Sequence, residues 1–111
     1  MPNLPIRITG INPDNTLILS DNGHTIARFN DTITWLIQPG SGVEIITAIE
    51  KKENSPNVFS SSPAPLGGST NWRGTIVNSI LVTTMYEYLI KYRKTGVAGE
   101  FLHDPIIQLN P

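Results

Sequence analysis

The chain has 111 residues, a net charge of −1 and no cysteine. This length supplies one hydrophobic core, so we expect a single domain over residues 1–111. The absence of cysteine excludes disulfides, cysteine-ligated metals and thiolate chemistry. Because eight basic side chains are set against nine acidic ones, no basic field is available for phosphates, and we expect no nucleic-acid partner.

The composition favours strands over helices. Only 15% of the residues are charged, against about 25% in typical soluble domains, and Asn, Thr and Ser are abundant instead. These residues suit turns and the exposed faces of strands. No apolar run approaches the roughly 20 residues that cross a bilayer, so no membrane partner is expected. Residues 1–5 lack the positive charge and the apolar run of a signal peptide, which favours a cytoplasmic location.

The first thirty residues predict short strands separated by turns. Ile6 and Ile8 alternate with polar residues, and the Asn-Pro-Asp-Asn sequence at 12–15 is typical of a turn inside a first hairpin. Asn22 and Gly23 belong to a second turn, since both tolerate a positive φ. Strands are therefore expected at residues 6–8, 17–19 and 25–29.

The middle of the chain contains the clearest alternation. Ile33, Trp35 and Ile37 fall on one face of an extended segment, which predicts that Trp35 is a core residue. A Pro-Gly-Ser-Gly break follows at residues 39–42. Over residues 43–49 we expect a further strand that places its odd-numbered residues on one face.

Residues 53–71 are expected to form the long loop of the chain. Their composition changes to Ser, Pro, Gly and Asn, interrupted by Val58, Phe59 and Leu66. Long loops in compact domains are functional, self-packed or mobile, and the sequence leaves these alternatives open. A strand over residues 72–77 is expected to follow.

The C-terminal part contains the second clear alternation. Over residues 85–93, Tyr86, Tyr88, Ile90 and Tyr92 share one face of a strand, and the opposite face is largely charged. A turn at residues 96–99 and a closing strand at residues 106–109 follow. About eight short strands joined by turns predict an all-β, two-sheet sandwich.

Few side chains could carry metal or catalytic chemistry. His24 and His103 are the only histidines, and their spacing is not typical of a metal site. A Ser or Thr nucleophile could combine with one of them and with Asp21 or Asp104, but a chain so rich in hydroxyls allows this by chance. Other acids are scattered, and the Gly-Gly-Ser-Thr run at 67–70 lacks the lysine of a phosphate loop. We therefore expect no metal, no cofactor and no catalytic residue.

An aromatic face remains as a candidate for binding. Tyr86, Tyr88 and Tyr92 could stack on sugars or bases, while packing between sheets is the alternative, since Ile90 lies in the same row. The possible ligand or partner surface comprises Phe59, Leu66, Trp72, Tyr86, Tyr88 and Tyr92.

Three segments resemble the cupredoxin family. They are DTITW at residues 31–35, YEYLI at residues 86–90 and DPIIQL at residues 104–109. The family has a D-x-V-x-W strand, a Y-x-Y strand shortly before its copper-binding cysteine, and a final strand that often reads D-P-x-I-x-V. The resemblance implies a cupredoxin-like, Greek-key fold of about seven to eight strands.

Blue-copper function does not follow from this resemblance. The family's thiolate position corresponds to Ile90, Gln38 stands in the region where a histidine is expected, and no methionine lies near residues 96–99. Blue-copper electron transfer needs one cysteine and two histidines. The resemblance therefore implies a copper-less relative.

These observations predict a non-enzymatic binding or interaction module, with residues 55–71 and the neighbouring strand ends as its contact surface. A small-ligand or carbohydrate binder that uses the aromatic face is one alternative, and an enzyme with a site near His24 or His103 is another. The expected partner is a protein or a small ligand. Low surface charge and unpaired sheet edges also favour a homodimer.

Overall fold

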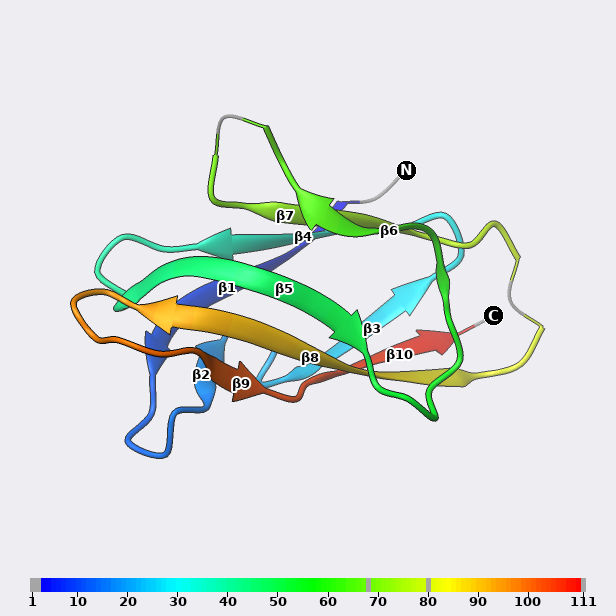
Figure 1. The fold of residues 1–111 in the computed structure, drawn as a ribbon. Coiled ribbons are helices and arrows are strands. Elements are labelled where there is room, and N and C mark those ends of the chain that lie inside the picture. The colour runs from blue at the N-terminus through cyan, green and yellow to red at the C-terminus, as the bar shows by residue number, and fades with distance from the viewer. Residues whose placement is uncertain (1–2, 68, 80, 111) are drawn as a thin grey trace.

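The structure, a computed structural model, describes residues 3–67, 69–79 and 81–110. Over these residues it contains ten strands and no helix, arranged in two mixed sheets (Figure 1). The all-β prediction is confirmed, and the two sheets are compatible with a sandwich. The described strands number ten, not about eight. Residues 1–2 of the N-terminal segment, Gly68 of the Gly-Gly-Ser-Thr run, Ile80 and Pro111 lie outside the described residues.

The first sheet has the strand order β2-β1-β4-β7-β6. Its strands are β1 (Asn3–Ile11), β2 (Leu17–Leu19), β4 (Thr32–Ile37), β6 (Phe59–Pro65) and β7 (Trp72–Ile76). β1 and β2 form the predicted hairpin, in which the Asn12 amide donates to the Thr16 carbonyl over 2.8 Å and Asn15 has a φ of 71°. β1 and β4 are parallel, because the chain crosses to the second sheet and back between them.

The second sheet is organised around β8. Its strands are β3 (His24–Arg28), β5 (Val43–Lys51), β8 (Thr84–Lys94), β9 (Phe101–His103) and β10 (Ile106–Asn110). The order is β3-β10-β8-β5, and β9 also pairs with β8. The first part of β8 pairs with β10 and a later part pairs with β9, while β5 runs along its other edge. Figure 1 shows β5 and β8 side by side, with β4 and β7 in the layer above them.

Aromatic rings from both sheets fill the interior. Trp35 and Tyr88 are fully buried, and Trp35 Nε1 donates a hydrogen bond to Tyr88 Oη over 3.2 Å. Tyr86 stacks on Tyr88 with 5.5 Å between ring centroids, and Phe59 meets Tyr86 edge-on at 5.1 Å. Such pairs add stability beyond the apolar area that they bury. The prediction that Trp35 is a core residue is confirmed.

The predicted long loop over residues 53–71 is wrong, because this segment contains β6. β6 pairs with β7 at the edge of the first sheet, with two shifts of register between Phe59 and Ala64. Pro63 and Pro65 are compatible with a strand here, since an edge strand leaves one side of its backbone unpaired. A serine- and proline-rich composition therefore indicates an edge strand at this position.

β5 confirms the strand predicted at residues 43–49 but not its alternation. Val43, Ile46 and Ile49 are buried, whereas Ile45 is 42% exposed. The register with β8 shifts between Val43 and Ile45 and again between Ile46 and Ala48. Each bulge adds a residue and reverses the faces of the side chains that follow, so a simple two-residue period fails.

No part of the chain that the structure describes forms a helix with the length and apolarity that membrane crossing requires.

Candidate functional site

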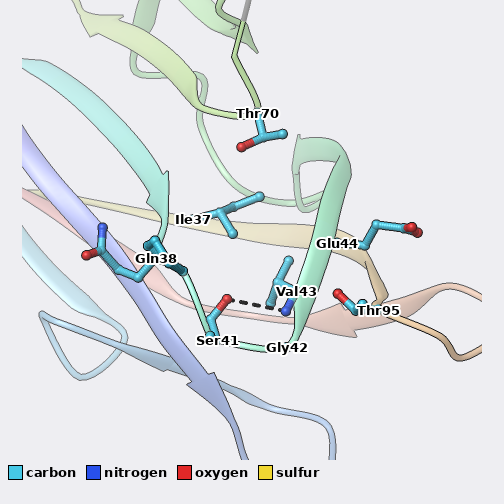
Figure 2. A pocket seen from close by; sticks show the side chains of 10 residues that line it. Ile37, Gln38, Ser41, Gly42, Val43, Glu44, Thr70 and Thr95 are labelled. Carbon is cyan, nitrogen blue, oxygen red and sulfur yellow. Dashed lines mark hydrogen bonds between the residues drawn. The ribbon is translucent and has the colours of Figure 1, made fainter.

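A hollow of about 520 Å³ lies at one end of the molecule, where β4 ends, β5 begins and the turn after β8 approaches (Figure 2). We call it the end hollow. Its lining comprises Ile37, Gln38, Pro39, Gly40, Ser41, Gly42, Val43, Glu44, Thr70 and Thr95. The lining comes from three separate connections, so the end hollow exists only in the folded chain.

The β4–β5 loop forms the floor of the end hollow, and main-chain hydrogen bonds hold it in place. Gly40 and Gly42 have φ values of 79° and 88°, which side-chain-bearing residues rarely adopt. The Gln38 amide donates to Ile8 O of the first sheet over 3.0 Å. The Thr95 amide of the second sheet donates to Gly42 O over 2.9 Å. The Pro-Gly-Ser-Gly sequence therefore makes a loop that is tied to both sheets.

The end hollow has a mixed apolar and polar lining and is almost uncharged. Ile37 and Val43 line it together with the hydroxyl-bearing Thr70 and Thr95, and Glu44 is its one ionisable lining residue. In Figure 2 the side chains of Ile37 and Val43 lie between Thr70 and Ser41, and the Glu44 carboxylate points away from them. Such a lining suits an uncharged ligand that has both hydroxyl groups and apolar surface, and it offers no cation to hold an anion.

A second hollow, of about 410 Å³, lies beside β2. We call it the side hollow. Its lining comprises Asn12, Thr16, Leu17, Ile18, Leu19, Asn22 and His103. The turn at Asn22 and Gly23, both with positive φ as the sequence predicted, closes one end of it. His103 is the titratable group of this lining.

The two histidines have different surroundings. His24 is exposed on β3, and its Nε2 lies 3.0 Å from Gln108 Oε1. His103 Nδ1 accepts a hydrogen bond from the Leu17 amide over 3.3 Å, and His103 Nε2 is buried without a partner among the described residues. Burial lowers the pKa of His103, although the carboxylates of Asp104, Asp21 and Asp14 act to raise it. No hydrogen bond joins either histidine to a Ser or Thr hydroxyl within residues 3–67, 69–79 and 81–110.

The described residues contain no group of three or more His, Asp or Glu side chains that could hold a metal ion. The acids have separate partners. Asp104 lies 3.2 Å from Lys52, Glu50 lies 2.7 Å from Lys91, and the buried Asp31 accepts from the Arg28 amide. These pairings stabilise turns and strand edges, and they bring no two carboxylates together.

The surface predicted from aromatic residues is wrong for all its rings, because the structure buries them. Tyr86, Tyr88 and Tyr92 are at most 2% exposed, Phe59 is 4% exposed and Trp72 is 8% exposed. Packing between the sheets, the alternative that Ile90 suggested, accounts for the row. Of this set only Leu66 remains half-buried near the surface.

Burial also shifts the ionisation of these tyrosines. It raises the pKa of Tyr86 to about 12 and that of Tyr88 further, because a phenolate loses its hydration in the core. The pKa of Tyr92 is raised for the same reason, and its hydroxyl donates to the Asn15 carbonyl. None of the three is suited to act as a base near neutral pH.

Ile90, the residue that the resemblance to cupredoxins aligns with the thiolate ligand, is fully buried in β8. It pairs with Ile49 on one side and with His103 on the other. The side chain is part of the core.

Sequence reasoning missed most of the end hollow. Thr70 belongs to the predicted contact segment 55–71, but Gln38, Ser41 and Thr95 attracted no functional interpretation. The sequence signal for the loop of the end hollow was the pair of glycines in the Pro-Gly-Ser-Gly run, since glycines allow an exposed backbone to take unusual φ values.

No protein-family model matches the chain, and no significant match is found among curated proteins.

Proposed function

We propose that the chain is a non-enzymatic binding module that takes a small, uncharged polar ligand in the end hollow. The observation that carries this proposal is the lining itself, in which hydroxyl-bearing and apolar side chains, with one carboxylate residue and no cation, surround an opening of about 520 Å³ on a loop tied to both sheets. A preorganised loop lowers the entropic cost of binding. The proposal retains part of segment 55–71 as contact surface through Thr70.

The scaffold is proposed to be a copper-less, Greek-key relative of the cupredoxins. Support comes from the places of the three resembling segments, which lie around β4, β8 and β10 in the two sheets. Ile90 in the core accounts for the loss of the thiolate without loss of packing. An experimental structure with different strand connections from those of cupredoxins would overturn this part of the proposal.

The binding proposal is tested by amide chemical shifts in the full chain. Maltose, an uncharged probe rich in hydroxyls, is expected to shift the amides of Gly40, Gly42 and Thr95, whereas acetate is expected to leave them unchanged. Affinity in the millimolar range would correspond to about 4 kcal/mol. Shifts that are absent with maltose, or equal with acetate, would contradict the proposal.

A pair of threonine substitutions provides the matched control. Thr70→Trp fills the end hollow, whereas Thr83→Trp places the same ring on an exposed residue of the β7–β8 loop. We expect the first variant to lose the maltose-dependent shifts and the second to keep them. If both variants bind alike, the ligand occupies another surface.

Exposed apolar residues favour a homodimer as a second candidate function. Leu81 and Val82 of the β7–β8 loop are 92% and 69% exposed, and Met85 and Ile26 on the outer face of the second sheet are 42% and 60% exposed. Met85 and Ile26 both pair with Gln108, so they lie in one row across three strands. Exposed apolar groups that lie in such a row are typical of protein contacts.

Sedimentation at increasing concentration tests the homodimer, with a Leu81→Ser/Val82→Ser variant for comparison. A chain that stays monomeric at every concentration would exclude the homodimer.

A further inference from the structure

His103 connects the two sheets at the side of the molecule. It lies on β9, where it pairs with Ile90 of β8 in the second sheet. Its ring reaches the first sheet, because the Leu17 amide of β2 donates to Nδ1 over 3.3 Å. β2 is the edge strand of that sheet, so this bond ties the edge of the first sheet to β9.

The hydrogen bond determines the protonation state of the ring. An acceptor Nδ1 carries a lone pair, and the proton of the neutral imidazole must then be on Nε2. Nε2 is buried and has no hydrogen-bond partner among the described residues. The ring therefore fits this place only in its neutral form.

We propose that His103 is an acid-sensitive latch that joins β2 to β9 when neutral and releases β2 when protonated. Protonation places a hydrogen on Nδ1, which then faces the Leu17 amide donor to donor. It also places a positive charge on a ring whose second nitrogen has no acceptor. Both changes destabilise the arrangement in which His103 is bonded to the Leu17 amide.

The carboxylates around the ring partly offset the cost of protonating it in place, but burial outweighs them and the pKa of His103 is lowered. Asp14 in the β1–β2 turn, Asp21 in the β2–β3 turn and Asp104 after β9 all act to stabilise the imidazolium. Strand β2 itself carries no titratable group, and Ile90 is the apolar neighbour on β8. Tyr92 and Lys94 of β8 are already bonded to Asn15 in the β1–β2 turn.

Each of these three acids has a partner other than the His103 ring. Asp14 accepts from Thr16, Asp21 accepts from Gly23 and Thr25, and Asp104 pairs with Lys52, so each is held near the ring without bonding to it. Release would free the Leu17 amide on the sheet edge and widen the side hollow, whose lining includes Leu17 and Leu19.

The latch is tested by ring nitrogen spectra and amide exchange on the full chain. At about pH 7.5 we expect His103 in the Nε2–H form, with a pKa below the ordinary value of about 6.5. Between about pH 7.5 and pH 5, protection of the Leu17 amide should fall at least about tenfold beyond the change in intrinsic exchange, while that of Ile33 in the central strand β4 stays constant. An Nδ1–H tautomer, a pKa at or above 6.5, or constant Leu17 protection would each overturn the proposal.

The other histidine is the matched control. His24→Gln should keep the pH response of Leu17, and it also assigns the two ring signals. His103→Phe should leave Leu17 weakly protected at every pH. If His103→Phe retains the pH response, another group is responsible and the latch is excluded. The wild-type spectra decide the question even if this variant does not fold.

Discussion

Strand β8 carries two regions with opposite chemistry. Along the strand, Tyr86, Tyr88 and Tyr92 turn into the core, and just beyond its end Thr95 lines the end hollow. The large rings, which resemble a ligand platform in the sequence, hold the sheets together. The end hollow, by contrast, carries exposed threonines such as Thr95, whose side chains take little part in packing. Substitutions in the two regions should therefore differ in their effect on stability.

The largest expected effect is alkaline unfolding, because it acts on the whole aromatic row. The chain has three tyrosines, and burial raises the pKa of each, to about 12 for Tyr86 and further for Tyr88. The unfolded chain loses these protons near pH 10. Their contribution to stability is therefore complete below about pH 10 and is lost as the pH rises through the folded values.

Near-ultraviolet absorbance of tyrosinate, recorded with the denaturant midpoint, measures this effect. We expect no tyrosinate at about pH 10 and a steep appearance together with unfolding at higher pH. Gradual ionisation near pH 10 with an unchanged midpoint would show that the rings are accessible. The contrast between the buried tyrosines of β8 and the open end hollow would then fail.

The next largest effect concerns Gly74 of β7. Because Gly74 has no side chain, the Phe59 ring can pack against it in the core. A Cβ added at Gly74 would lie 2.7 Å from Phe59 Cε1 and 3.2 Å from the Pro63 nitrogen. Phe59 is itself held by Tyr86, so it cannot move aside freely. We expect Gly74→Ala to lower the free energy of unfolding by about 1–3 kcal/mol.

Gly67→Ala is the control for this substitution. Its Cβ would meet no atom within 4 Å, so its effect on the free energy of unfolding should be within about 0.5 kcal/mol. Chemical denaturation of both variants gives the comparison. Equal costs would mean that Phe59 is not tightly packed.

A smaller effect is expected from removing one core hydroxyl. Tyr88→Phe leaves the buried Trp35 Nε1 without its acceptor, which should cost about 1–2 kcal/mol. Tyr86→Phe removes a hydroxyl that has no hydrogen bond among the described residues, and its cost should be near zero. Denaturant midpoints measure both. A larger cost for Tyr86→Phe would contradict the assignment of the core bond.

The sequence predicted the parts of the fold in which local periodicity and burial agree. The alternations around Trp35 and Tyr88 indicated two strands, and both are present, although only β8 has the one buried face, because Thr34 of β4 is buried together with Ile33 and Trp35. Turns at Asn22 and Gly23 followed from the φ values that these residues tolerate. These features depend on residues within a few positions of each other.

The sequence did not predict features that depend on tertiary context. The bulges of β5 are set by its pairing with β8, and β6 is stabilised by β7 despite a composition typical of loops. Gln38, Thr70 and Thr95 are far apart along the chain, and only the fold brings them to one hollow. The sequence showed that Tyr86, Tyr88 and Tyr92 share one face of a strand, but it did not show whether that face is covered by the other sheet.

The smallest expected effect is that of Thr95→Val in the end hollow. Thr95 is exposed, and its structural hydrogen bond uses the main-chain amide, which the substitution retains. We expect a change within about 0.5 kcal/mol in the free energy of unfolding. Thr34→Val is the matched control, because the buried Thr34 hydroxyl donates to Asn3 Oδ1 over 2.7 Å and accepts from Arg73 Nε over 3.3 Å. That variant should cost about 1 kcal/mol.

The pair also tests the binding proposal, since a hydroxyl that contributes nothing to folding is free to contribute to recognition. If Thr95→Val weakens maltose-dependent shifts at unchanged stability, the hydroxyl acts on the ligand. If it costs as much stability as Thr34→Val, the end hollow belongs to the same structural network as the core, and the two regions of β8 no longer differ in kind.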